Sequence, residues 1–203
     1  MRTHFSLSNR SRRRHYTIVE MMMVVAVFMI ILAMITAAWL NSGPQVKLKS
    51  AARMVNAQLN LARAKAVAER KPVGVHFASS GEDYYRYGCR LFYDDNKNGT
   101  KAATENFVPD EEWVTLPGGV VFAVRTSGSD PQCVFSNAAP QDIAFDAKGR
   151  VVSGSATVPF YVTAGDRKTG PIQTGAYRGE PYFKFEVNSF TGRSTATYYE
   201  VND

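Results

Sequence analysis

Residues Met21 to Leu40 read MMMVVAVFMIILAMITAAWL, twenty residues with no charge and a single hydroxyl, at Thr36. As an α-helix rising about 1.5 Å per residue, this stretch extends about 30 Å, which matches the hydrocarbon core of a bilayer. A helix buried in a soluble core is the alternative, but such a helix is usually shorter and has a polar stripe. The stretch therefore predicts a transmembrane helix, which we place over residues 16–41.

The charges before this stretch indicate its orientation. Residues 1–15 contain five arginines and no acid, and positively charged flanks stay on the cytoplasmic side of a membrane. The carboxyl-terminal part is then expected outside the cytoplasm. Removal of the stretch as a secretory signal peptide is disfavoured, because the small residues Ala37 and Ala38 are followed by the bulky Trp39.

Length and composition limit the remaining possibilities. The 203 residues suffice for one globular domain with an accessory segment, and a content of 45% hydrophobic and 21% charged residues excludes a disordered chain. The net charge of +6 would suggest binding to nucleic acid or to a membrane surface if it were spread over the fold. Residues 72–203, however, contain twelve basic and sixteen acidic residues. The globular part is therefore expected to be net negative.

A second helix is predicted after the apolar stretch. Asn41-Ser42-Gly43-Pro44 interrupts the first helix, because proline lacks a backbone donor and disfavours helical geometry in the residue before it. Apolar residues then recur at helical spacing, which predicts an amphipathic helix over residues 45–71 that ends before Pro72. These apolar positions are Leu48, Ala51, Ala52, Val55, Leu59, Ala62 and Ala66.

The remainder, residues 72–203, is predicted to be rich in β-strands. Short apolar or alternating segments are separated by turn sequences such as Ser-Ser-Gly, Asn-Gly and Pro-Gly-Gly. The predicted fold class is α+β. A long amino-terminal helix packs with its carboxyl-terminal half on an antiparallel β body. The candidate strands are 72–79, 84–93, 112–124, 132–136, 141–146, 150–152, 156–162, 181–187 and 194–201.

Catalytic residues are scarce. His4 and His15 lie in the basic amino terminus, so His76 is the only histidine available to a folded site. It alternates with Val75 and Phe77, so we expect its side chain on the opposite face of a strand, at the surface. No nucleophile motif, phosphate loop or dinucleotide fingerprint accompanies it. The sequence predicts neither an enzyme nor a cofactor.

One acidic segment has the spacing of a calcium loop. In such a loop oxygen ligands alternate around the cation and a glycine permits the sharp turn. A helix is needed on both sides, whereas the flanking sequences here read as strand and loop. We therefore expect a plain hairpin turn without a metal and keep calcium as the alternative. The residues concerned are Asp94, Asn96, Asn98, Gly99 and Glu105.

Cys89 and Cys133 are the only cysteines, and the predicted topology places both outside the cytoplasm, where a disulfide is chemically permitted. Such a bond would stabilise the fold by about 4 kcal/mol through restriction of the unfolded chain. Two separate buried thiols are the alternative, since sequence does not show whether the two residues are close.

Glu20 lies at the start of the apolar stretch, where a carboxylate is costly unless it has a partner or reaches water. Together with Arg12-Arg13-Arg14-His15 and Tyr16-Thr17-Ile18-Val19, it resembles the leader and amino terminus of type IV pilins and pseudopilins. In that family a basic leader is cut before an aromatic residue, the new amine is methylated, and glutamate is the fifth mature residue. The resemblance implies a cut between His15 and Tyr16, although His15 stands where the family usually has glycine. A chain that keeps its leader is the alternative.

The later part of the chain is similar to one branch of these proteins, the general secretion pathway protein H (GspH) and FimT family. The similar segments are residues 57–67 with Pro72-Val73, residues 142–150, residues 183–187 and Thr191-Gly192-Arg193. The resemblance implies two β-sheets behind the helix.

The same resemblance implies a role as a minor pseudopilin, a structural subunit of the fibre of a type II secretion system or a type IV pilus. The implied location is the inner membrane, crossed once, with the carboxyl-terminal domain in the periplasm. The implied partners are other major and minor pseudopilins, the inner-membrane assembly platform and the prepilin peptidase. A FimT-like minor pilin that binds DNA through Arg193 is the alternative, which the net negative charge of residues 72–203 disfavours.

Overall fold

The computed structural model describes residues 17–40, 44–130, 132–136, 138–152, 159–171 and 180–200, with the backbone alone for residues 33–40 and 44. The chain divides into two compact units, Met1–Ser42 and Gly43–Asp203. His15 and Tyr16 lie outside the described residues. Each unit is described below by itself.

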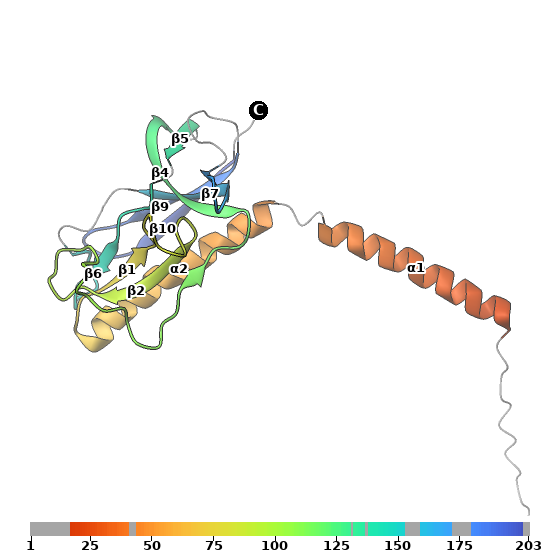
Figure 1. The fold of residues 1–203 in the computed structure, drawn as a ribbon, viewed down its shortest axis with the longest axis horizontal. Coiled ribbons are helices and arrows are strands. Elements are labelled where there is room, and N and C mark those ends of the chain that lie inside the picture. The colour runs from red at the N-terminus through yellow and green to blue at the C-terminus, as the bar shows by residue number, and fades with distance from the viewer. Residues whose placement is uncertain are drawn as a thin grey trace, which may run out of the picture. The chain divides into compact units, whose positions relative to one another are not determined.

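The first unit contains helix α1, Ile18–Leu40 (Figure 1). Thr17 caps its amino terminus, because the Thr17 Oγ1 accepts the backbone N–H of Glu20 at 3.2 Å. In the part of the chain that the structure describes, no helix combines the length and the hydrophobicity needed to cross a membrane. The structure therefore does not confirm the transmembrane segment predicted over residues 16–41.

The second unit begins with helix α2, Pro44–Glu69. Proline suits the first turn of a helix, since the N–H that it lacks has no helical partner there. The helix ends where Arg70 adopts a positive φ of 54° and Pro72 follows. All seven apolar positions predicted for its buried face are buried, with exposed fractions of 4% or less.

The first of two antiparallel sheets has the strand order β3-β2-β1-β6. Strand β1 is central and pairs with β2 through Val75 and Leu91 and with β6 through Val73 and Phe145. The strands are β1 (Val73–Phe77), β2 (Gly88–Tyr93), β3 (Val114–Thr115) and β6 (Ile143–Phe145).

The second sheet has the order β10-β9-β7-β4-β5, with β8 paired to β7. Strand β4 pairs with β7 along its first half and with β5 along its second half, where the register shifts between Arg125 and Ser127. The strands are β4 (Val120–Ser129), β5 (Gln132–Ser136), β7 (Phe160–Asp166), β8 (Gly170–Pro171), β9 (Tyr182–Val187) and β10 (Ser194–Tyr199).

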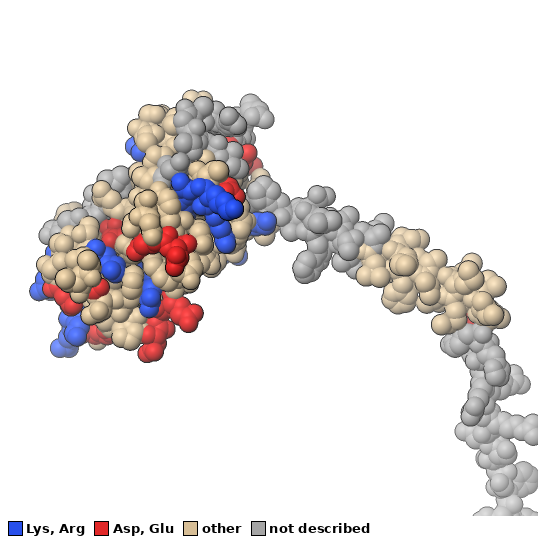
Figure 2. Space-filling view, in the orientation of Figure 1, with Lys and Arg blue, Asp and Glu red and all other residues tan. Residues whose placement is uncertain are grey.

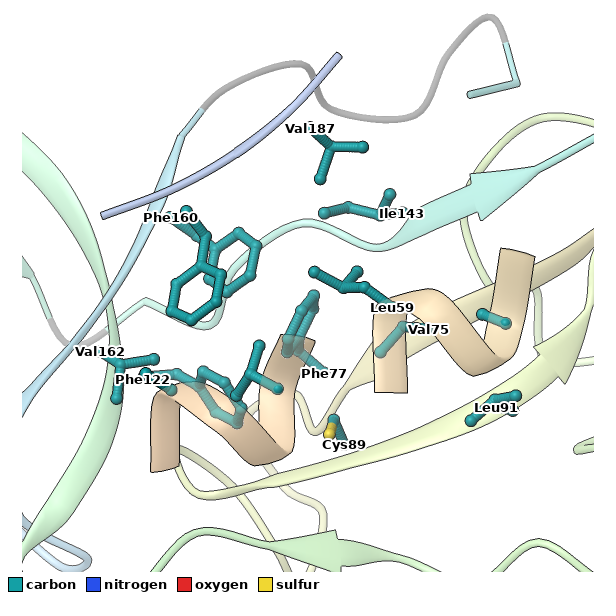
Figure 3. Close-up of a cluster of buried hydrophobic side chains, with 14 of the residues drawn as sticks. Leu59, Val75, Phe77, Cys89, Leu91, Phe122, Ile143, Phe160, Val162 and Val187 are labelled. Atoms are coloured by element: carbon teal, nitrogen blue, oxygen red, sulfur yellow. The ribbon is translucent and has the colours of Figure 1, made fainter. Parts of the chain in front are cut away.

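The main hydrophobic core lies where α2 meets both sheets, and Figure 1 shows the helix lying along the two sheets. Figure 3 shows Leu59 of α2 and Phe77 of β1 among side chains of the second sheet, including Phe122 and Phe160. The rings of Phe77 and Phe122 have centroids 4.9 Å apart. The α+β class with antiparallel sheets is thus confirmed for the described residues of the second unit.

Several predicted strands differ from the observed ones. Residues 84–87 form turns in place of the first half of the strand predicted over 84–93. The strand predicted over 112–124 is divided, because Pro117-Gly118-Gly119 forms a turn between β3 and β4. Strand β4 also continues to Ser129, past the predicted end, and the short β8 was not predicted.

The disulfide hypothesis is wrong for this structure, in which Cys89 and Cys133 are free and buried. Cys89 belongs to β2 and packs in the core below α2, whereas Cys133 belongs to β5 and packs with Phe135, Tyr161 and Tyr182. The two thiols therefore belong to different sheets and different clusters. Burial raises the pKa of Cys89 to about 12, which keeps its thiol protonated and unreactive.

Candidate functional site

The surface of α1 is the most prominent candidate for an interaction site. Every described side chain from Ile18 to Leu32 is exposed, and the large apolar ones expose between 45% and 82% of their surface. Figure 2 shows the described part of this helix without a charged side chain beyond its first turn. A contiguous apolar surface of this kind marks contact with a membrane or with other proteins.

Glu20 lies in the first turn of α1 and is exposed. The carboxylate at this position complements the positive end of the helix dipole. Thr17 and Glu20 also have the three-residue separation of a capping box, in which threonine caps the helix and glutamate reaches back toward the cap. One half of this capping box is present, because Thr17 Oγ1 accepts the backbone N–H of Glu20. The sequence signature of a capping box, Thr-x-x-Glu before an apolar run, is present here, but the capping box was not predicted.

His76 is buried, with 7% of its surface exposed, so the expectation of a surface histidine is wrong. The side chain does lie opposite Val75 and Phe77 on β1, but aromatic residues of a following loop cover this face. The ring centroid of His76 lies 6.0 Å from that of Phe107 and 6.1 Å from that of Trp113. Strand alternation predicted the direction of the side chain but could not predict this cover.

Both ring nitrogens of His76 face carboxylates. Nδ1 lies 2.9 Å from Asp142 Oδ1, and Nε2 lies 3.1 Å from Glu82 Oε2. Burial by itself lowers the pKa of His76, but the hydrogen bonds and charges of Asp142 and Glu82 outweigh it and raise the pKa above its ordinary value. The protonated imidazolium, a donor at both nitrogens, fits between the two carboxylates.

The same carboxylates also hold the backbone of three segments together. Asp142 accepts the N–H of Phe77 at 3.2 Å and that of Lys101 at 2.8 Å, and Glu82 accepts the N–H of Ser79 at 2.6 Å. The group contains no nucleophile facing the histidine. Its contacts form a structural clamp that joins β1 and the loop after it, the loop of Lys101 after β2, and the approach to β6.

The segment with calcium-loop spacing is a turn whose carboxylates accept hydrogen bonds from backbone amides. Asp94, fully buried, accepts the N–H of Asn98 at 3.1 Å and that of Gly99 at 3.0 Å. Glu105 accepts the N–H of Asn96 at 3.2 Å and that of Ala102 at 2.7 Å. Among the described residues no group of three or more His, Cys, Asp or Glu side chains is arranged to hold a metal ion.

The oxygens that calcium would need are therefore directed at amide donors. The side-chain oxygens of Asn96 and Asn98 likewise accept backbone N–H groups two residues further on. Burial raises the pKa of Asp94, with a smaller contribution from the charge of Glu105, and this opposes the amide hydrogen bonds that lower it. The geometry favours the plain turn over the calcium alternative.

Arg193, the candidate for phosphate binding, is exposed and follows the tight turn at Gly192. This turn lies against a second one at Gly149, so that a Cβ atom on Gly192 would clash with the carbonyl oxygen of Gly149. Arg63 of α2 donates from its Nε to the same oxygen at 3.1 Å. Two segments that resemble the GspH and FimT family, residues 142–150 and 191–193, thus meet on α2.

A second polar cluster, partly buried, was not predicted from the sequence. Asp130 accepts hydrogen bonds from Tyr182 Oη at 3.0 Å and from Cys133 Sγ at 3.1 Å, and it pairs with Lys184 at 2.8 Å. Burial opposes ionisation of Asp130, but Lys184, Cys133 and Tyr182 together lower its pKa. Only the pairing of β4, β5 and β9 brings these residues together.

An apolar exposed helix, followed in the chain by a helix buried against two antiparallel sheets, defines a pilin-like protein. The family model of the type II transport protein GspH matches residues 51–176, which is more than half of the chain. The chain therefore belongs to the GspH family, and the resemblance seen in its sequence is confirmed.

Several solved structures are similar to this chain, and two of them are described here. The type IV minor pilin FimU of Pseudomonas aeruginosa strain PAO1 has 16% sequence identity and a TM-score of 0.42, over 75% of this chain and 90% of that chain. The minor pseudopilin EpsH from the type II secretion system of Vibrio cholerae has 14% identity and a TM-score of 0.43, over 79% of this chain and 99% of that chain. No curated protein sequence matches the chain.

The His76 clamp predicts a loss of stability at alkaline pH. Because the folded-state pKa of His76 is raised, its pairing stabilises the fold fully below about pH 6.5 and is lost as pH rises through the raised value. We expect His76→Gln to lower the free energy of unfolding by about 3 kcal/mol at pH 6 and by clearly less at pH 9. Urea titrations of the unmodified protein and of His76→Gln measure this difference in the free energy of unfolding. The contributions of other titrating groups cancel, because both proteins contain them. A difference that is constant with pH would contradict the clamp.

The Asp94 turn predicts stability that does not depend on calcium. Asp94→Ala removes the carboxylate that accepts the buried Gly99 amide and the Asn98 amide, so we expect it to lower the free energy of unfolding by about 2–4 kcal/mol. The neighbouring exposed Asp95 provides the control, since Asp95→Ala should change it by less than about 0.5 kcal/mol. Adding calcium chloride or a chelator should leave the melting temperature of the unmodified protein unchanged. A rise with calcium that Asp94→Ala abolishes would restore the metal site.

Proposed function

We propose that the chain is a minor pseudopilin, a structural subunit of the pilus-like fibre of a type II secretion system. The observation that carries this proposal is α1, whose described side chains are exposed on all sides and, apart from Glu20, apolar. Before assembly into the fibre, such a helix needs a lipid environment. After assembly, it needs apolar neighbours. The family model, which is named for type II transport, favours a secretion system over a type IV pilus.

The proposal includes a location and a set of partners. Residues 16–41 anchor the subunit in the inner membrane in a single pass, and the folded unit after them lies in the periplasm. This part rests on the sequence, namely on the twenty uncharged residues and the five arginines before them. The partners are other pseudopilins, the inner-membrane assembly platform and a prepilin peptidase that cuts between His15 and Tyr16.

Glu20 has a specific role in this proposal. A carboxylate at the edge of an apolar helix is stabilised by a nearby cation, and the attraction is stronger where water is excluded. The cation is the amine of Tyr16 created by the cut, in the same subunit or in a neighbour. Cleavage and assembly are thereby linked through one ion pair.

A minor pilin that binds DNA is the second candidate. Arg193, Lys148 and Arg63 lie on or beside the two glycine turns, and this is the observation in its favour. Residues 72–203 contain sixteen acidic and twelve basic residues, and this net negative charge opposes binding to phosphate. Figure 2 shows acidic and basic side chains mixed over the face in view. We therefore rank fibre assembly first.

The role of Glu20 is tested by substitution and cross-linking in cells. We expect Glu20→Ala, Glu20→Val and Glu20→Gln to reduce cross-linking to other pseudopilins about tenfold, equivalent to about 1.4 kcal/mol, because each removes the charge. Circular dichroism of the second unit should be unchanged. The intact mass of the membrane-extracted protein, recorded in parallel, shows whether residues 1–15 are removed.

Two controls separate pairing from helix capping. Thr17→Ala removes the cap but keeps the carboxylate, and Glu112→Gln removes an exposed charge from the other unit. Both variants should cross-link like the unmodified protein. Normal cross-linking of all three Glu20 variants would show that Glu20 is only an interfacial glutamate. The absence of cross-links in the unmodified protein would contradict fibre assembly itself.

A further inference from the structure

The turn between β9 and β10 presents a large apolar side chain to solvent. Phe190 exposes 82% of its surface, the largest value for a large hydrophobic residue among the described residues of the second unit. Val67 of α2, which is 48% exposed, contacts the neighbouring turn at Gly149. Exposed aromatic side chains are costly in water, and they are frequent as anchors in protein interfaces.

The turn that holds Phe190 is rigid. The side-chain oxygen of Asn188 accepts the N–H of Phe190 at 3.1 Å and that of Thr191 at 2.9 Å. Backbone hydrogen bonds close the turn from Gly192 to Asn188 at 2.7 Å and from Asn188 to Arg193 at 2.9 Å. Little conformational freedom remains to be lost on binding, which is the property of a preorganised anchor.

A shallow groove lies near the turn that carries Phe190. The groove has a volume of about 380 Å³ and lies along the outer side of α2. Arg63 lines it and also contacts both glycine turns, which places the groove beside the Phe190 turn. The residues of the groove are Asn60, Arg63, Ala64, Val67 and Ala68.

The charges of this region are unbalanced. In the described part of the chain, Arg63, Lys148 and Arg193 form no ion pair. Asp146, the carboxylate of the Gly149 turn, is already paired with Arg150 at 2.8 Å. A partner that covers this region therefore needs carboxylates to match the three cations. We call the region formed by Arg63, Val67, Lys148, Phe190 and Arg193 the Phe190 surface.

We propose that the Phe190 surface docks a neighbouring fibre subunit that presents an apolar pocket edged by carboxylates. This inference rests on the proposed function, because it names the contact by which the folded unit joins its neighbour. Phe190 fills the pocket as the anchor, while Arg193 and Lys148 select an acidic partner and fix its orientation. The contact is expected to weaken with salt, as exposed ion pairs do.

The test uses a photo-reactive phenylalanine analogue in the full-length chain, in cells that assemble the fibre. The analogue replaces Phe190 in one protein and the exposed Asp95, in another loop, in the control. We expect position 190 to give a product whose mass identifies another pseudopilin, and position 95 to give none. Lys148→Glu combined with Arg193→Glu should reduce that product about tenfold, whereas an unchanged melting temperature shows that the fold is intact.

Each contrary outcome has a distinct meaning. Cross-links to pseudopilins from position 95 but not from position 190 would leave fibre assembly standing and refute the Phe190 surface. A product that nuclease removes would assign the surface to nucleic acid instead. Insensitivity to the charge reversal would refute the acidic partner. If neither position nor the Glu20 experiment yields a pseudopilin, the proposed function itself fails.

Discussion

The burial of one face of α2 against both sheets is the interaction on which the folded unit depends. Its buried residues are mostly small, and Ala51, Ala62 and Ala66 are completely inaccessible to solvent. Small side chains let the helix backbone approach the strands closely, while Leu48 and Leu59 fill the space between the sheets. A fully buried leucine contributes about 1.5–3 kcal/mol, so this single helix supplies a large part of the stabilisation. The rings of Phe77 and Phe122 join the two sheets directly, and α2 extends this shared core along both of them.

The outer face of the first sheet is covered in a different way. There the carboxylates of Asp94, Glu105 and Asp142 accept backbone N–H groups of the loops that cross it. Buried amides need acceptors, and these three side chains supply them. The loops are therefore ordered by polar contacts, whereas the helix side is ordered by apolar burial. This division leaves the Phe190 turn, on neither face, as an exposed and preorganised element.

The features that repeat locally could be predicted from the sequence. The spacing of Leu48 to Ala66 predicted the buried face of α2, and alternation around His76 predicted the direction of its side chain. The partners of His76 and of Cys133 could not be predicted, because they come from segments far apart in the chain. Calcium-like spacing at Asp94 was ambiguous for a related reason, since spacing does not reveal whether oxygens meet a cation or backbone amides. The meeting of the Gly149 and Gly192 turns on Arg63 likewise depends on tertiary packing.

The central role of α2 in the folded unit is tested most directly by one matched pair of substitutions. Ala62 is fully buried, and Ala64, two residues away, is exposed. A leucine at position 62 would therefore press on the packed core, whereas a leucine at position 64 would extend into solvent. The measurement is the free energy of unfolding by urea. We expect Ala62→Leu to lower it by about 1–3 kcal/mol through overpacking, and Ala64→Leu to change it by less than about 0.5 kcal/mol. Equal stability of the two variants would contradict the close packing of α2 on both sheets.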